Sequence, residues 1–84
     1  MFFYVFKKQA LKDLQKLPKD IQKRILTKLD YFVVSDNTLN FAESLVNFEI
    51  GQYRFRIGDY RVIFDVEGVK IIILTLGHRR KIYK

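Results

Sequence analysis

The chain has 84 residues, of which 49% are hydrophobic, and this length allows one small domain with a modest core. Sixteen Lys and Arg against nine Asp and Glu give a net charge of +7, which favours polyanionic or acidic partners. The absence of cysteine excludes disulfides, thiolate nucleophiles and cysteine-based zinc sites.

The first half of the chain predicts one strand followed by two helices. Residues 2–6 are aromatic or β-branched and predict a buried strand, a run too short for a signal peptide or a membrane span. Apolar residues at helical spacing then predict a helix from about Lys7 that Pro18 closes, and a second amphipathic helix over residues 21–33. We therefore expect a soluble, cytoplasmic protein that does not enter a membrane.

After a loop at residues 35–40 and a stretch over 41–52 that supports no single assignment, the chain predicts a β-hairpin. Its strands, residues 53–57 and 60–66, alternate with period two. Aromatic and aliphatic side chains therefore share one face of the hairpin, and arginines share the other.

The turn of this hairpin fixes which arginines meet. Gly58-Asp59 suits a two-residue type II′ turn, whose first central position prefers glycine. In that register Arg56 lies directly opposite Arg61, and Arg54 shares their face. Like charges directly opposite each other destabilise a sheet, so we expect these arginines to bind an anion, namely nucleic-acid phosphate. The alternative is that they form an ordinary solvated outer face.

A third strand over residues 69–76 is nearly all apolar, which predicts burial on both of its faces. With Glu67-Gly68 as a two-residue turn, Asp65 lies opposite Lys70, and this opposite-charge pair supports the register.

The predicted fold is a small α+β domain over residues 1–84, in the order β-α-α-β-β-β. Two helices pack on one face of an antiparallel sheet, and the opposite face is open and basic. Gly77 ends the last strand, and residues 78–84 form a short helical turn or a tail. The same register places Leu74 beside Arg61, so that apolar residues border the basic face.

Several common enzyme mechanisms lack their motifs here. The sequence has no Gly-rich phosphate loop, no GxSxG elbow and no zinc-type spacing, so we expect no metal and no small-molecule cofactor. Cleavage of RNA by its own 2′-hydroxyl remains possible, because it needs only proton transfer and a cation at the phosphate. Arginine suits the cation, and His78 and Tyr83 are the titratable candidates. The alternatives are a surface position for His78 and a ring packed on a helix for Tyr83.

The hairpin over residues 53–64 resembles that of the RelE/ParE superfamily of bacterial and archaeal type II toxins. The later sequence also resembles this superfamily, as it reads Gly77-His78-Arg79-Arg80-Lys81-Ile82-Tyr83. Leu14, Leu17 and Pro18 match the Leu-x-x-Leu-Pro stretch of the same families. By this resemblance the catalytic residues are Arg61, Arg79, His78 and Tyr83. Two basic clusters, the arginines of the hairpin and residues 78–81, supply further cations. From these clusters and the resemblance, the residues expected to bind RNA phosphate are Arg54, Arg56, Arg80 and Lys81.

RelE-like members of this superfamily are messenger-RNA endonucleases that act in the ribosomal A site and are silenced by a cognate antitoxin. The resemblance therefore implies an endoribonuclease whose partners are an antitoxin and a ribosome carrying message. RelE itself carries lysines where Arg54 and Arg56 stand, so the general base and general acid stay unassigned. Two alternatives remain: a ParE-like DNA gyrase inhibitor without nuclease activity, and a degenerate relative that only binds its antitoxin.

Overall fold

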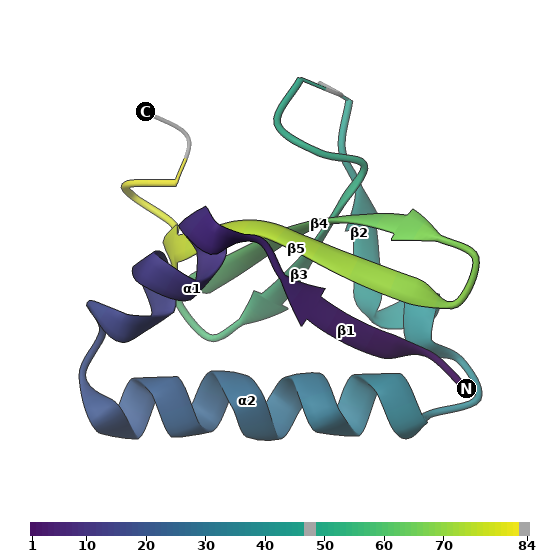
Figure 1. Ribbon diagram of the computed structural model, residues 1–84, viewed down its shortest axis with the longest axis horizontal. Helices are drawn as coiled ribbons and strands as arrows, with labels where there is room; N and C mark the ends of the chain where they lie inside the picture. The colour runs from purple at the N-terminus through teal and green to yellow at the C-terminus, as the bar shows by residue number, and fades with distance from the viewer. Residues whose placement is uncertain (47–48, 83–84) are drawn as a thin grey trace.

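The computed structural model describes residues 1–46 and 49–82, which form two α-helices, a short 3-10 turn and a five-stranded sheet (Figure 1). The elements are β1 (Phe3–Phe6), α1 (Lys8–Gln15), α2 (Lys19–Val34), η1 (Thr38–Phe41), β2 (Ala42–Ser44), β3 (Tyr53–Ile57), β4 (Tyr60–Glu67) and β5 (Lys70–His78). The strand order is β1-β5-β4-β3-β2. The α+β fold is confirmed, but the sheet is mixed, because β1 pairs parallel with β5 while the other neighbours are antiparallel.

Both helices bury their apolar side chains against one face of the sheet. Figure 1 shows α2 running beneath the strands, and α1 lies beside β5. A row of aromatic rings joins α2 to the sheet. The ring centroids of Phe32 and Phe55 are 4.6 Å apart, and those of Phe55 and Phe64 are 4.3 Å apart. The predicted apolar face of the hairpin is therefore the face that the helices cover.

The first hairpin has the predicted register, with Arg56 opposite Arg61. A type II′ turn at Gly58-Asp59 requires a positive φ at the first central residue and a negative φ at the second. Gly58 has a φ of +60°, and Asp59 has a negative φ, since within the described ranges only glycines have positive φ values. The turn thus places glycine at the first of its two central positions.

The predicted register of the second hairpin was wrong, because its turn is Gly68-Val69 and not Glu67-Gly68. Glycine thus occupies the first central position of this turn, as it does in the first hairpin. Glu67 therefore lies opposite Lys70, and Asp65 lies opposite Ile72.

A β-bulge then separates the two ends of this hairpin. Phe64 pairs with Ile73 but Ile63 pairs with Thr75, so Leu74 is an extra residue in β5. The bulge reverses which face each later residue of β5 occupies.

Two further predictions at the end of β5 need correction. Arg61 lies opposite Gly77 and not beside Leu74, and the strand continues to His78. Beyond it, the backbone N–H groups of Lys81 and Ile82 both donate to the His78 carbonyl, which forms a single turn.

The second face of the sheet is only partly open, contrary to the sequence prediction. Figure 1 shows residues 45–46 and 49–52, which lie between β2 and β3, rising on the side opposite α2. Gly51 from this connection is buried, and a Cβ added to it would lie 2.5 Å from Ile63 Cγ2 and 3.1 Å from Leu74 Cδ1. The connection therefore covers part of this face at Ile63, the cross-strand partner of Arg54.

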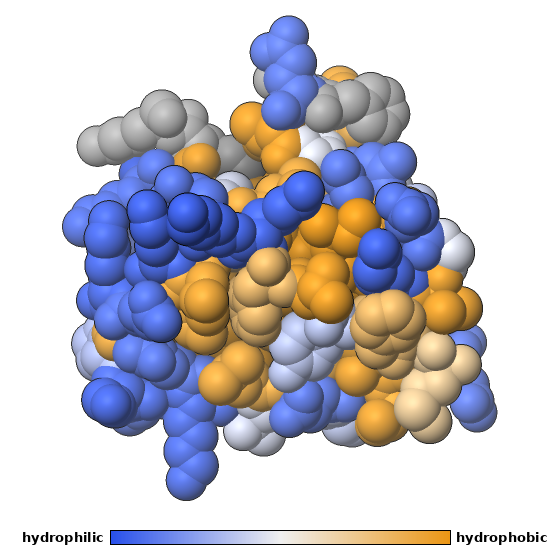
Figure 2. Space-filling view, in the orientation of Figure 1, coloured by the Kyte–Doolittle hydropathy of each residue, from blue (hydrophilic) through white to orange (hydrophobic). Residues whose placement is uncertain are grey.

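Apolar side chains remain exposed along β1. Phe3 is 49% and Val5 is 40% exposed, and Figure 2 shows the apolar area over β1 and β5 with hydrophilic residues on either side. In the part of the chain that the structure describes, neither helix has the length and apolar character needed to cross a bilayer.

Replacement of Gly51 by alanine should strongly destabilise the domain. Its φ of +149° disfavours any other residue, and the added Cβ would collide with Ile63. We expect the free energy of unfolding to fall by about 2–5 kcal/mol in urea denaturation. Gly68→Ala is the matched control, since Gly68 has a φ of +62° but nothing within 4 Å of its Cβ position. It should lose only the backbone cost of about 1–2 kcal/mol, and equal losses would contradict the tight packing at Gly51.

A hydrogen bond between β1 and α2 should make stability depend on alkaline pH. The Tyr4 hydroxyl donates to Asp30 Oδ1 at 2.6 Å. Burial, with the nearby Asp30 carboxylate, raises the pKa of Tyr4 from 10.0 to about 12. Because the pKa is raised in the folded state, the contribution is complete below pH 10 and disappears as pH rises through about 12.

Tyr4→Phe should therefore unfold more easily than the wild type below pH 10, and the difference should shrink between pH 10 and 12. Chemical denaturation of both proteins across this range measures the effect. A difference that stays constant up to pH 12 would show that Tyr4 ionises normally.

Candidate functional site

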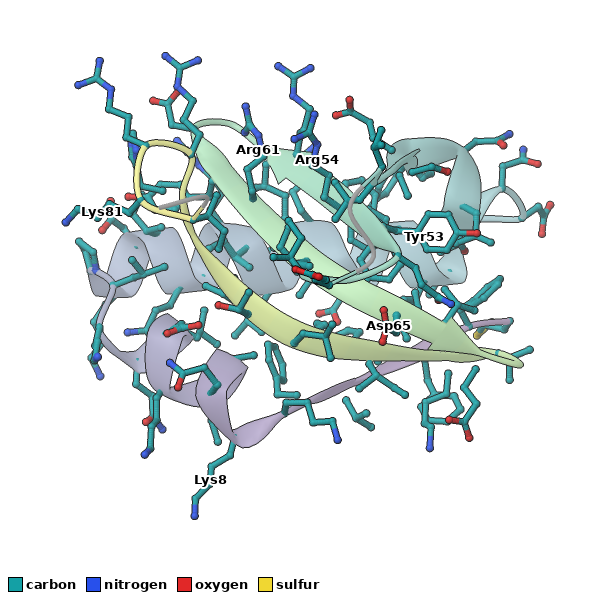
Figure 3. All side chains as sticks on the ribbon, turned by 90° about the horizontal axis from the view of Figure 1, so that it is seen from above. Lys8, Tyr53, Arg54, Arg61, Asp65 and Lys81 are labelled. Carbon is teal, nitrogen blue, oxygen red and sulfur yellow. The ribbon has the colours of Figure 1, made fainter. Side chains whose placement is uncertain are left out.

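Strands β3 and β4 carry three arginines on the face opposite α2. Arg56 and Arg61 are direct cross-strand partners, and Arg54 lies one alternation further along β3. Figure 3 shows Arg54 and Arg61 on adjacent strands, pointing to the same side. We call these three residues the arginine face. The structure thus brings together the arginines that the sequence predicted to meet.

Arg61 is anchored within the fold. It is only 6% exposed, and its Nη1 donates to the carbonyls of Gly58 at 2.9 Å and Tyr60 at 3.0 Å. These two bonds tie its guanidinium to the β3–β4 turn and fix its orientation. A guanidinium has five N–H donors, so Arg61 retains donors for a ligand.

Glu43 is a member of this site that sequence reasoning missed. It lies on β2, directly across from Arg54, whose Nη2 is 3.2 Å from Glu43 Oε2. Arg56 Nε lies 3.7 Å from Glu43 Oε1. The hydrogen bond from Arg54, together with the charges of the arginine face, lowers the pKa of the Glu43 carboxyl below its usual value. Glu43 also places a potential proton acceptor on this face.

No local pattern could have identified Glu43, because β2 has only three residues and its pairing with β3 spans the unassigned segment. The arginine face therefore contains its own carboxylate.

His78 lies on the other side of the sheet from the arginine face. It pairs with Tyr60 across the β4–β5 ladder, and their rings are 5.6 Å apart, edge to face. Directly opposed residues share a face, and Tyr60 packs against the core that α2 covers. The bulge at Leu74 is responsible, since an uninterrupted alternation from Ile73 would have placed His78 with the arginines.

The hydrogen bonding of His78 identifies its free nitrogen. The backbone N–H of Arg80 donates to His78 Nδ1 at 3.1 Å, so the proton of the neutral ring lies on Nε2. His78 in this form presents an N–H group at Nε2.

His78 lines a hollow of about 610 Å³ between α1, the ends of β4 and β5, and the turn that follows β5. Arg80 and Lys81 also line it, opposite Lys16 and Leu17. Arg80 and Lys81 therefore belong to this hollow and not to the arginine face.

Arg79 faces the β3–β4 turn. Its Nε lies 3.8 Å from Asp59 Oδ1, and its backbone N–H donates to the Asp59 carbonyl at 2.8 Å. Asp59 thus ties the segment after β5 to the first hairpin. Tyr83 lies outside the described residues, so its predicted role has no structural counterpart here. Within residues 1–46 and 49–82, no three His, Asp or Glu side chains gather closely enough to hold a metal ion.

The sequence matches the family profile described as the ParE toxin of the type II toxin–antitoxin system parDE, over residues 4–83. The chain belongs to the RelE/ParE superfamily of toxins. No curated protein sequence matches this toxin.

Solved structures of the superfamily have the same fold. A RelE–RelB complex from Pyrococcus horikoshii contains a chain 32% identical to this toxin, with a TM-score of 0.70 and coverage of 95% of this chain and 97% of that one. A RelB–RelE complex from Methanococcus jannaschii gives 30% identity, a TM-score of 0.72 and 94% coverage of both chains. A RelBE toxin–antitoxin complex from Mycobacterium tuberculosis gives 25% identity, a TM-score of 0.78 and coverage of 93% and 98%.

Arg61→Ala should destabilise this toxin as well as alter its surface. The substitution removes the donors to the Gly58 and Tyr60 carbonyls from a buried position, and we expect a loss of about 1–3 kcal/mol in urea denaturation. Arg56→Ala removes the same charge from a side chain that is 60% exposed, and should change stability by less than about 1 kcal/mol. Equal effects of the two variants would contradict the anchoring role of Arg61.

Proposed function

We propose that this toxin is a messenger-RNA endonuclease that cuts in the ribosomal A site, by attack of the 2′-hydroxyl on the neighbouring phosphate. The observation that carries the proposal is the arginine face. Three guanidinium groups gather there against like-charge repulsion, and Arg61 is held in a fixed orientation. Superfamily membership is the second support.

The arginine face suits the charge that develops in this reaction. As the 2′-oxygen attacks phosphorus, negative charge grows on the non-bridging oxygens, and the 5′-oxygen leaves to give a 2′,3′-cyclic phosphate and a 5′-hydroxyl. Arg54, Arg56 and Arg61 supply fixed positive charge to these oxygens, so the reaction requires no metal ion. DNA lacks the attacking hydroxyl, which restricts the substrate to RNA.

Proton transfer is assigned to His78 and Tyr83. The hydrogen bond that the Arg80 N–H donates to Nδ1 leaves Nε2 as the His78 nitrogen available to a substrate. Because His78 faces the hollow, RNA would have to pass around the end of the sheet, with its phosphate on the arginine face and a neighbouring nucleotide near His78. Arg79 lies at this end of the sheet, where it bonds with the β3–β4 turn. Arg80 and Lys81, which line the hollow, are proposed to bind further phosphates.

The proposed partners are a cognate antitoxin and the ribosome with its message. The structural neighbours from three organisms are complexes of a toxin with its antitoxin. A net charge of +7 favours an acidic antitoxin, and the cytoplasm is the compartment in which both partners would be met.

One observation favours a second candidate, a gyrase inhibitor that cuts nothing. The bulge at Leu74 separates His78 from the arginine face, so the residues for proton transfer and phosphate binding do not converge on one point. An inhibitor needs no such convergence.

Cleavage should depend on Arg54. This side chain is less buried than Arg61, so its removal should cost less folding stability. In a reconstituted translation system with a defined message, primer extension should detect cuts that require translating ribosomes. We expect Arg54→Ala to lower the cutting rate roughly a hundredfold, because a charged donor to the phosphate is lost.

Lys8→Ala is the charge-matched control, since Lys8 lies on α1 and points away from the arginine face in Figure 3. It should cut at the wild-type rate. Intact message with the wild-type toxin would overturn the nuclease proposal, and inhibition of DNA supercoiling by gyrase in a parallel assay would then establish the second candidate.

A further inference from the structure

The arginine face is not a free set of cations, because Glu43 reaches into it. Glu43 Oε2 lies 3.2 Å from Arg54 Nη2, and Oε1 lies 3.7 Å from Arg56 Nε. One carboxylate thus contacts two of the three guanidinium groups. Its negative charge offsets the repulsion between arginines that lie on adjacent strands.

These contacts use the same N–H groups that a phosphate would use. A guanidinium binds carboxylate and phosphate oxygens through the same forked donors, at nearly the same distances. Arg54 therefore cannot offer this donor to RNA while the carboxylate stays in place. At 3.7 Å from Arg56 Nε, the same carboxylate acts on the second guanidinium through its charge alone. Arg61 differs, because its partners are the backbone carbonyls of the turn.

We propose that Glu43 is an internal counter-ion which occupies a phosphate-binding N–H group of Arg54 and offsets the charge of Arg56, and which RNA must displace to bind. The inference rests on the proposed function only in taking RNA phosphate as the ligand of this face. Glu43 stabilises the RNA-free protein and opposes its binding to RNA.

The position of Glu43 suits displacement. Its side chain is 42% exposed, and it comes from a three-residue strand at the edge of the sheet. Its Oε1 is buried and accepts no hydrogen bond from the described residues, and its contact with Arg56 is longer than a hydrogen bond. The carboxylate is therefore incompletely satisfied where it lies, and rotation toward solvent would hydrate it.

The proposal predicts opposite changes in stability and in affinity when the charge is removed. Glu43→Gln keeps the size of the side chain but loses both ion pairs. The repulsion between the guanidinium groups of the arginine face is then no longer offset by a negative charge. Its thermal unfolding midpoint should fall, while its affinity for RNA should rise. A residue that merely orients the arginines would lower both quantities on substitution.

The probe is a 2′-O-methyl RNA hexamer, which cannot be cut because the attacking hydroxyl is blocked. Fluorescence anisotropy should show that Glu43→Gln binds roughly two- to tenfold more tightly than the wild type at moderate salt. A plot of log affinity against log salt concentration should be steeper by about 0.7 for each arginine that is released.

Glu67→Gln controls for net charge. Glu67 lies at the opposite end of β4 from Arg61 and pairs only weakly with Lys70, at 4.0 Å. It removes the same charge without touching the arginine face. Binding by Glu43→Gln that is no tighter than binding by Glu67→Gln would overturn the counter-ion role.

Arg54→Ala separates this failure from failure of the proposed function. If Arg54→Ala weakens binding while Glu43→Gln does not strengthen it, RNA binds the arginine face and only the counter-ion role is wrong. If Arg54→Ala binds as tightly as the wild type, RNA does not use this face, and both the counter-ion role and the proposed phosphate site are overturned.

Discussion

The two-residue turn at Gly58-Asp59 is the constraint on which the rest of this toxin depends. A type II′ turn sets the pairing of β3 with β4, and side chains alternate strictly along each strand. With the turn in place, Phe55 and Phe64 point toward α2 and the arginines point away from it. A shift of one residue would have put guanidinium groups into the core. The same glycine therefore determines both the hydrophobic core and the charged surface.

Charge on that surface is balanced by partners of two kinds. Backbone carbonyls of the turn accept hydrogen bonds from the buried Arg61, whereas the Glu43 carboxylate contacts Arg54 and Arg56 with a side chain that is 42% exposed. The backbone contacts give one cation a fixed orientation, and the contacts with Glu43 offset part of the positive charge of the other two. The protein thereby maintains a dense cluster of positive charge in a domain of only 84 residues.

Sequence reasoning succeeded where a local rule decided the outcome and failed where pairing between distant segments decided it. The first hairpin was predicted correctly because alternation and glycine at the first central turn position agreed. The turn of the second hairpin was misplaced by one residue because Gly68 was given the second turn position, and this moved the partner of Asp65 by two residues, from the predicted Lys70 to Ile72. The bulge at Leu74 has no sequence signal, yet it turns His78 to the α2 side. Glu43 was missed because its role arises only when β2 pairs with β3. The face that each candidate residue occupies was thus harder to predict than the elements themselves.

A single carboxylate on α1 accepts hydrogen bonds from the part of β5 that the short strand β1 does not reach. β1 pairs with β5 only as far as Ile73, and beyond that point Asp13 Oδ2 accepts hydrogen bonds from the Thr75 hydroxyl at 2.6 Å and from the Leu76 backbone N–H at 3.3 Å. Unpaired backbone groups at a sheet edge are the usual starting point for strand addition between molecules. Because Asp13 already bonds to the Leu76 N–H, this stretch of β5 is closed to intermolecular strand pairing. The end of the sheet where Arg61 and His78 lie is thereby protected against the addition of a foreign strand.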